Sequence, residues 1–178
     1  MKNTMRKCFL FLVLALIVAG GVFAQRVGDT VQVNGQRYLV EQVNGDRLVL
    51  LKVRYEVVNQ ALSWTDAKAA AERAGGHLAV ITSAEEQRTI EALVTSNGTR
   101  NVYWIGGYCE SDRVWKWVTG ERMSYTNWGP GEPNNNGGNE IRMSFTRQPF
   151  TFQGNRILFG QWVDEVNGRS NGYIIEYN

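Results

Sequence analysis

Glu132-Pro133-Asn134-Asn135-Asn136-Gly137-Gly138-Asn139-Glu140 is the stretch on which we expect the rest of the fold to converge. It contains too much glycine, asparagine and proline for the interior of a helix or strand, so it predicts a loop. The loop carries two carboxylates and several side-chain amides, and such oxygens are the ligands that Ca²⁺ prefers. A cis peptide bond before the proline would aim the neighbouring carbonyl groups the same way. The stretch therefore predicts a calcium-binding loop, and the alternative is an ordinary solvated surface loop.

Residues 1–24 have the pattern of a secretory signal peptide. Three basic residues precede an unbroken apolar run from Cys8 to Ala19, and Val22-Phe23-Ala24 suits a signal peptidase. The apolar run is shorter than the ~20 residues that span a bilayer, which argues against a membrane anchor. We therefore expect cleavage, no membrane span in the mature chain, and a protein that is secreted or extracytoplasmic, in the periplasm or at the cell exterior.

The charge of the chain argues against two classes of partner. The 178 residues, enough for one domain with a core, include 19 basic and 17 acidic side chains. The predicted signal accounts for three of the basic ones, which leaves 16 basic against 17 acidic residues. A near-neutral mature chain offers no electrostatic attraction for nucleic acid or an anionic membrane, so neither is expected as a partner.

Cysteine usage excludes an internal disulfide in the mature chain. Cys8 falls in the predicted signal, which leaves Cys109 alone. A secreted domain without disulfides must be held together by its hydrophobic core, or partly by a metal ion. We expect Cys109 to be a partly buried thiol, and the alternative is a disulfide between two chains.

Residues 25–53 are predicted to form a short β meander ahead of the main domain. Asn-Gly pairs lie in the repeated sequence Gln-Val-Asn-Gly, which begins at Gln32 and again at Gln42. Asn-Gly is the strongest short signal for a hairpin, because both turn positions need positive φ. The pairs separate three β-rich runs, Val31–Val33, Tyr38–Val43 and Leu48–Val53.

Two helices and several short strands are predicted in the main domain. Ser63 with Asp66 and Ser83 with Glu86 have the spacing of capping boxes, and Gly75-Gly76 ends the first helix. The expected strands are Tyr55–Val58, Val102–Ile105, Val114–Val118, Ile141–Phe145, Ile157–Phe159, Gln161–Val163 and Tyr173–Tyr177. Helices followed by short antiparallel strands indicate an α+β domain.

Five tryptophans cluster in the C-terminal half, and two interpretations are open for them. They could be platforms on which sugar rings stack, or they could belong to the core. We favour the core, because tryptophan on a strand buries a large apolar area. The residues are Trp104, Trp115, Trp117, Trp128 and Trp162.

The order of motifs over residues 54–178 resembles the C-type lectin-like domain. The matching motifs are Trp64-x-x-Ala67, Gly75-Gly76-His77-Leu78-Ala79, Ser83-x-x-Glu86, Trp104-Ile105-Gly106-Gly107, Trp115-x-Trp117-x-x-Gly120, Asn127-Trp128, Gly131-Glu132-Pro133-Asn134-Asn135, Gly138-Asn139-Glu140, Trp162-x-Asp164 and Gly172-Tyr173-Ile174-Ile175-Glu176. Each motif is weak alone, and the series in order is highly specific. The resemblance implies an α+β fold with two helices, two small antiparallel sheets and a long loop region. The sequence resembles disulfide-free, bacterial-type members of the family.

The resemblance also implies a site. In the family the principal Ca²⁺ ion would be held by Glu132 and Asn134, on either side of a cis Pro133, together with Glu140 and Asp164. The same four residues would contact a carbohydrate. The Glu-Pro-Asn form of this motif is linked in the family to mannose-type sugars, so the expected partner is a glycan or glycoprotein.

This sequence departs from the family pattern in three ways. Val163 stands where the family has an asparagine, so one metal ligand and one donor to the sugar are missing, and calcium binding should weaken. The usual disulfides are absent, with Ala71 and Ile175 at the positions of one, and Arg142 and Asn167 at those of the other. No accessory calcium site can be placed on the sequence.

Three functions come into question for these residues. The first is a secreted, Ca²⁺-dependent carbohydrate-binding module. The second is a protein-interaction or adhesion module that uses the same loops without metal, which Val163 favours. The third is an enzyme, and we expect none, because nothing in the sequence encloses Glu132 and Glu140 as a catalytic pair and His77 is the only histidine.

Overall fold

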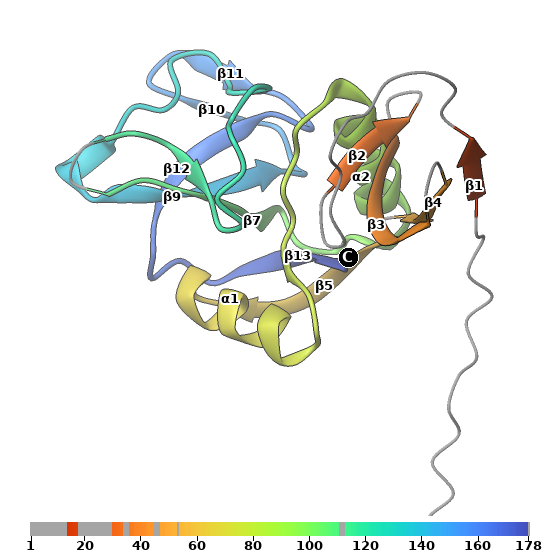
Figure 1. Ribbon diagram of the computed structural model, residues 1–178. Helices are drawn as coiled ribbons and strands as arrows, with labels where there is room; N and C mark the ends of the chain where they lie inside the picture. The colour runs from red at the N-terminus through yellow and green to blue at the C-terminus, as the bar shows by residue number, and fades with distance from the viewer. Residues whose placement is uncertain are drawn as a thin grey trace, which may run out of the picture. The chain divides into compact units, whose positions relative to one another are not determined.

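The computed structural model describes residues 14–17, 30–33, 36–44, 47–52, 54–110 and 113–177 (Figure 1). They fall into two compact units, whose boundary in the sequence lies between residues 53 and 54. The predicted signal peptide lies outside the described residues, apart from the four-residue strand β1 (Leu14–Ile17). Its cleavage therefore stays a prediction.

The N-terminal unit contains the predicted meander. Strands β2 (Thr30–Val33), β3 (Gln36–Asn44) and β4 (Arg47–Lys52) pair antiparallel in that order, and β1 is added beside β4. The registers pair Val33 with Gln36 and Asn44 with Arg47, as expected for two successive hairpins. The second hairpin turns one residue later than the Asn-Gly pair predicts, because Asn44 itself belongs to β3.

Helix α1 (Trp64–Arg73) begins and ends where the sequence predicts. The hydroxyl of Ser63 accepts a hydrogen bond from the backbone N–H of Asp66 at 3.1 Å and donates one to its carboxylate at 2.7 Å. At the other end Gly75 has a φ of +83°, and the N–H groups of Gly75 and Gly76 donate to carbonyls of the last helical turn. This pattern is a Schellman cap, which favours glycine at the left-handed position.

Helix α2 (Ala84–Asn97) uses a modified capping box. Ser83 accepts a hydrogen bond from the N–H of Glu86, as predicted. The Glu86 carboxylate, however, accepts from the backbone N–H and the hydroxyl of Thr82, at 2.7 and 2.8 Å. Within the described residues neither helix is long and apolar enough to cross a membrane.

One sheet of seven strands forms the centre of the second unit, and α1 lies beside β5 and β13 (Figure 1). Its strands are β5 (Arg54–Leu62), β6 (His77–Leu78), β7 (Val102–Tyr108), β8 (Lys116–Trp117), β9 (Glu140–Thr146), β12 (Trp162–Val166) and β13 (Asn171–Tyr177). The order is β12-β9-β7-β13-β5, with β6 on β13 and β8 on β7. A parallel pairing of β7 with β13 joins the two small antiparallel sheets that were expected.

Strands β10 (Phe150–Phe152) and β11 (Asn155–Ile157) form a separate hairpin, which lies between β9 and β12 in the sequence. The prediction contained one strand here, Ile157–Phe159, and missed β10. Gln153 and Gly154 form the turn, with φ of +47° and +82°. Glutamine before glycine is not one of the usual hairpin signals, which explains the omission.

The tryptophans confirm the core interpretation for three of the five. Trp104, Trp117 and Trp162 are at most 1% exposed, whereas Trp115 and Trp128 are half-buried. Trp128 lies edge-on to both Trp115 and Trp162, with ring centroids 4.9 and 6.1 Å apart. These aromatic contacts connect the long loop region to the sheet beneath it.

The positions that the resemblance aligned with disulfides are held by packing and hydrogen bonds. Ala71 and Ile175 lie in one apolar cluster together with Trp64. The guanidinium carbon of Arg142 lies 4.7 Å from the centroid of the Trp64 ring, and the carbonyl of Asn167 accepts a hydrogen bond from the Trp64 N–H at 3.1 Å. Trp64 therefore packs with residues at the positions of both of the disulfides that the family usually has.

Cys109 is fully buried. This agrees with the predicted thiol, although the burial is deeper than expected. A buried sulfur cannot reach a second chain without rearrangement of the domain, so the alternative of an interchain disulfide is disfavoured.

Candidate functional site

The nine-residue stretch from Glu132 to Glu140 is a loop, as predicted, and its Glu132–Pro133 peptide bond is cis. The loop closes through a short 3₁₀ turn, Asn136–Gly138. Asn135 enters that turn with a φ of +50°, a left-handed conformation in which asparagine is enriched among residues other than glycine. The cis bond and the left-handed Asn135 are thus the local features that shape the loop.

Asp164 reaches this loop from β12. Its Oδ1 accepts a hydrogen bond from the backbone N–H of Asn134 at 2.8 Å, and its Oδ2 accepts one from Asn135 at 2.8 Å. The residue is only 3% exposed. Because both carboxylate oxygens face the loop, Asp164 points toward Glu132 and Asn134 and not away from them.

The remaining predicted residues are connected within the loop. The Asn134 amide donates to Glu132 Oε1 at 2.7 Å, and its Oδ1 accepts from the Asn136 N–H at 2.7 Å. The same Asn136 N–H also lies 2.7 Å from Glu140 Oε2. The structure therefore brings all four predicted residues into one hydrogen-bonded arrangement.

Two asparagines act in the site without having been assigned a role from the sequence. Asn135 donates its N–H to Asp164, and its Oδ1 accepts from the Glu140 N–H at 3.2 Å. Asn136 links Asn134 to Glu140 through its own N–H. The signal that could have identified them is the run of three asparagines, because asparagine tolerates the left-handed backbone that such a compact loop needs.

The carboxylates of the site are electrostatically unfavourable neighbours. The pKa of Glu132 is raised to about 8. Burial is the largest cause, and Asp164 adds to the rise through a hydrogen bond and through its negative charge. Burial also raises the pKa of Glu140 above its usual value, and the charge of Asp164 adds to that rise. Acidic groups held this close are stabilised by a bound cation or a shared proton.

The side-chain oxygens of the site could provide only part of the coordination shell of a calcium ion. Glu132 Oε2 is buried and accepts no hydrogen bond from an N–H group of the described residues; its acidic neighbour is Asp164, so a cation could bind there. Within that part of the chain, however, no three acidic, histidine or cysteine side chains form a ready metal cluster. Ca²⁺ takes 6–8 oxygens, so the amide of Asn134 and backbone or water oxygens would have to complete the shell. Val163, 3% exposed, provides no side-chain oxygen.

The β10–β11 hairpin packs against the loop. A Cβ atom added to Gly129 would lie 2.6 Å from Ile157 Cδ1, and one added to Gly131 would lie 2.5 Å from Asn155 Nδ2. Both distances are shorter than real Cβ contacts, so a side chain at either position would require Ile157 or Asn155 to move, and the two glycines allow the hairpin to lie close to the segment before Pro133. The sequence did not predict this contact, since the hairpin itself was only half recognised.

The comparisons with known proteins agree with the motif series. Residues 60–174 match the family described as Lectin C-type domain. A lectin from Pleurodeles waltl is 32% identical over 127 residues, which cover 69% of this chain and 69% of that protein.

Two solved structures have the same fold. The cow C-type carbohydrate-recognition domain of CD23, crystallised in the presence of a GlcNAc2Man3 oligosaccharide, has 26% identity and a TM-score of 0.58, over 72% of this chain and 89% of that chain. A calcium-independent type II antifreeze protein has 26% identity and a TM-score of 0.56, over 83% of this chain and 95% of that one.

The fold class predicted from the sequence is therefore confirmed. The matching family consists of non-enzymatic carbohydrate-binding proteins, in agreement with the expectation that the chain is not an enzyme. The chain belongs to the C-type lectin domain family.

Proposed function

We propose that this protein is a carbohydrate-binding module that recognises a mannose-type sugar through a calcium ion at Glu132, Asn134, Glu140 and Asp164. The observation that carries the proposal is the position of Asp164, whose two carboxylate oxygens accept hydrogen bonds from the loop between Glu132 and Glu140. Further support comes from the raised pKa of Glu132, which a bound cation would lower.

The proposed chemistry assigns a task to each side chain. A bound calcium ion would accept one lone pair from each of two neighbouring sugar hydroxyls. Glu132 and Glu140 are acceptors for the protons of those hydroxyls. One amide hydrogen of Asn134 is engaged with Glu132 Oε1, and the second is available to donate to the sugar. Two hydroxyls that are both equatorial match this alternation of donors and acceptors.

The first experiment measures calcium binding without any sugar. A ligand of the folded state raises the free energy of unfolding by RT ln(1 + [L]/Kd), or ~1.4 kcal/mol at ten times Kd. We expect ~10 mM CaCl₂, about ten times the weak end of the range for extracellular modules, to raise the melting temperature, and MgCl₂ to raise it less. Glu132→Gln should abolish the shift, whereas Glu110→Gln, at an exposed acid outside the loop, should keep it. An unchanged melting temperature in CaCl₂ would remove the ion from this proposal.

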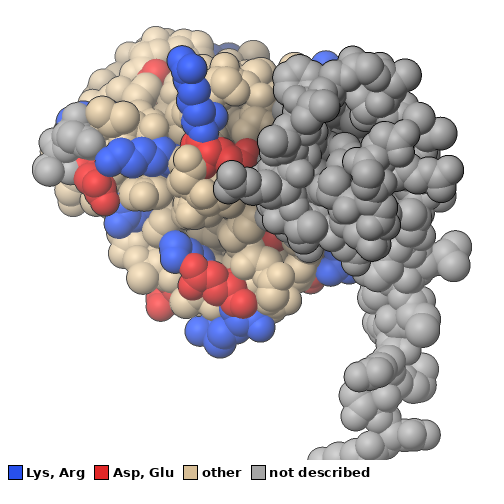
Figure 2. All heavy atoms as spheres, viewed as in Figure 1, with Lys and Arg blue, Asp and Glu red and all other residues tan. Residues whose placement is uncertain are grey.

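The second experiment identifies the sugar. We expect a glycan array to retain mannose-type glycans in the presence of CaCl₂ and to lose them in EDTA. On the face that Figure 2 shows, basic and acidic side chains of the described residues are interspersed without a broad patch of one sign, so this face offers no charged surface that would select charged glycans. Retention that follows sialylation or sulfation instead would contradict the proposed sugar class.

A second candidate function is a calcium-independent interaction module on the same loops. The observations that favour it are Val163 in place of a metal ligand and a loop whose hydrogen bonds are formed without any ion. The array experiment separates the two candidates, because a protein or glycan ligand retained equally in EDTA belongs to this second function.

We also propose that the mature chain acts outside the cytoplasm, on the basis of the signal pattern in residues 1–24. N-terminal sequencing of the exported protein should begin at residue 25. Export without loss of the first 24 residues would contradict cleavage.

A further inference from the structure

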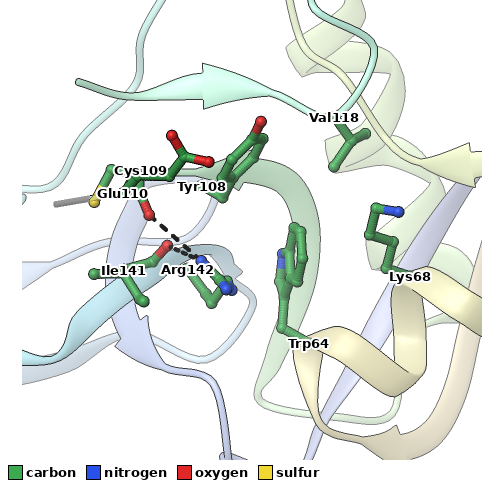
Figure 3. A pocket seen from close by; sticks show the side chains of 8 residues that line it. All are labelled: Trp64, Lys68, Tyr108, Cys109, Glu110, Val118, Ile141 and Arg142. Carbon is green, nitrogen blue, oxygen red and sulfur yellow. Dashed lines mark hydrogen bonds between the residues drawn. The ribbon is translucent and has the colours of Figure 1, made fainter. Parts of the chain in front are cut away.

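A cavity borders β9 just beyond Glu140 and shares none of the four predicted site residues. It has a volume of about 480 Å³ and is open to solvent on one side. Trp64 and Lys68 from α1, Tyr108 from the end of β7, Val118, and Arg142 from β9 contribute to its lining (Figure 3). The volume falls within the ~300–1,000 Å³ range of pockets that take small molecules.

Arg142 is the unusual residue of this cavity. It is half-buried, and its guanidinium lies over the Trp64 ring at 4.7 Å. One terminal nitrogen, Nη1, donates to the carbonyl of Ile141 at 3.0 Å and reaches that of Cys109 at 3.5 Å. The Nε–H is buried and has no hydrogen-bond partner among the described residues. The other terminal nitrogen, Nη2, has no hydrogen-bond partner among the described residues and is not among their buried unpaired atoms, so it is the donor that Arg142 can offer in the cavity.

The nearby carboxylates are engaged with other cations. Glu165 lies opposite Arg142 in the β12–β9 register, but it pairs with Arg169 at 3.2 Å. Glu110, which also lines the cavity, pairs with Lys116 at 3.1 Å. No ion pair joins Arg142 to a carboxylate in the described part of the chain. Arg142 shares the charge of Glu110 with Lys116 and has no carboxylate in direct contact, so an anion that enters the cavity would add to its compensation.

We propose that this cavity binds a small ligand that carries a carboxylate on an apolar or aromatic body. The carboxylate lies against Nη2 of Arg142 and forms a charge-assisted hydrogen bond there. The body packs on Tyr108 and Val118. Lys68 lies across the Trp64 ring from Arg142 (Figure 3) and adds positive charge to the cavity, which it shares with its partner Glu72. This inference does not rest on calcium or on sugar binding.

The test uses benzoate as the probe and benzamide as its neutral isostere, titrated by NMR into the full mature chain in EDTA. For ligands of this size we expect a Kd on the order of 1–10 mM for benzoate, with shifts confined to the cavity residues. Benzamide should bind at least about tenfold more weakly, because it cannot satisfy the cation. Inorganic phosphate should also bind more weakly than benzoate, because it lacks the apolar body.

Variants separate this site from weak binding elsewhere. Arg142→Gln should weaken benzoate about tenfold, and Lys68→Gln, at a helix position that tolerates polar substitutions, should weaken it a few-fold. Arg156→Gln, at an exposed arginine of β11, is the matched control and should leave the affinity unchanged. If Arg142→Gln does not fold, Lys68→Gln alone decides. Benzamide that binds as tightly as benzoate, or benzoate affinity that neither variant changes, overturns the proposal.

Discussion

Asp164 accepts a hydrogen bond from the backbone N–H of Asn134 at 2.8 Å across 30 positions of sequence. This contact and its partner to Asn135 attach the long loop to β12 of the central sheet. The loop therefore keeps its shape in a state without metal, and an ion would enter a site that is already assembled. Such preorganisation lowers the entropic cost of binding.

We expect Asp164→Ala to destabilise the protein by about 2–4 kcal/mol, since it removes two hydrogen bonds to a charged acceptor and leaves two N–H groups unpaired. Urea unfolding in EDTA measures the change. Glu72→Gln, at an exposed ion pair of α1, is the control and should shift the free energy of unfolding by less than about 0.5 kcal/mol. Equal effects of the two substitutions would mean that Asp164 does not hold the loop.

Stability should depend on pH through Glu132. Its pKa rises from an ordinary 4.5 to about 8 on folding, so between these values the folded state holds a proton that the unfolded state has released. The folded state then binds more protons, and stability falls as pH rises through this window. We expect the melting temperature in EDTA to fall from pH 5 to pH 8, and to fall less steeply in Glu132→Gln. Glu110→Gln should keep the wild-type slope, and an identical slope in all three proteins would contradict the assignment.

Val163→Asn should tighten calcium binding on the order of tenfold, because it restores an oxygen ligand to an incomplete shell. The same change places an amide at a position only 3% exposed, so the protein without calcium should be less stable. Isothermal titration and thermal unfolding measure the two effects separately. Val114→Asn, at a valine that is 55% exposed, should change neither quantity. An unaltered affinity in Val163→Asn would show that residue 163 does not face the ion.

The double variant Glu132→Gln and Asn134→Asp should move the sugar preference from mannose-type toward galactose-type glycans. The exchange reverses which side of the site donates and which accepts, so it selects a different arrangement of hydroxyls. Competitive elution with the two monosaccharides measures the preference. A preference that stays with mannose would place the sugar elsewhere on the domain.

Gly129→Ala should destabilise the protein by about 1–3 kcal/mol, because the new Cβ would lie 2.6 Å from Ile157 Cδ1 and push the β10–β11 hairpin away from the loop. Gly168→Ala is the matched control, since nothing lies within 4 Å of its added Cβ. The pair is compared by urea unfolding, and calcium affinity should fall only in Gly129→Ala. If both variants behave like the wild type, the hairpin does not support the site.

Much of the fold could be predicted because the signals were local. Ser63 and Ser83 cap their helices by contacts three residues away, and Gly75 takes the left-handed position that ends α1. Two features were not predicted, one because its local signal is unusual and one because it depends on distant segments. The turn at Gln153-Gly154 lacks a usual hairpin dipeptide, and the parallel pairing of β7 with β13 joins strands that are separated in the sequence by five further strands and the long loop.

The sequence by itself determined the helix caps, the bend at Pro133 and the order of motifs that identifies the family, because each of these depends on residues close together in the chain. Only the tertiary structure decided that Asp164 turns into the loop, that Ile157 packs against Gly129, and that Arg142 stacks on Trp64 beside an open cavity. These contacts join distant segments, and their geometry follows from how the whole core packs rather than from any local pattern.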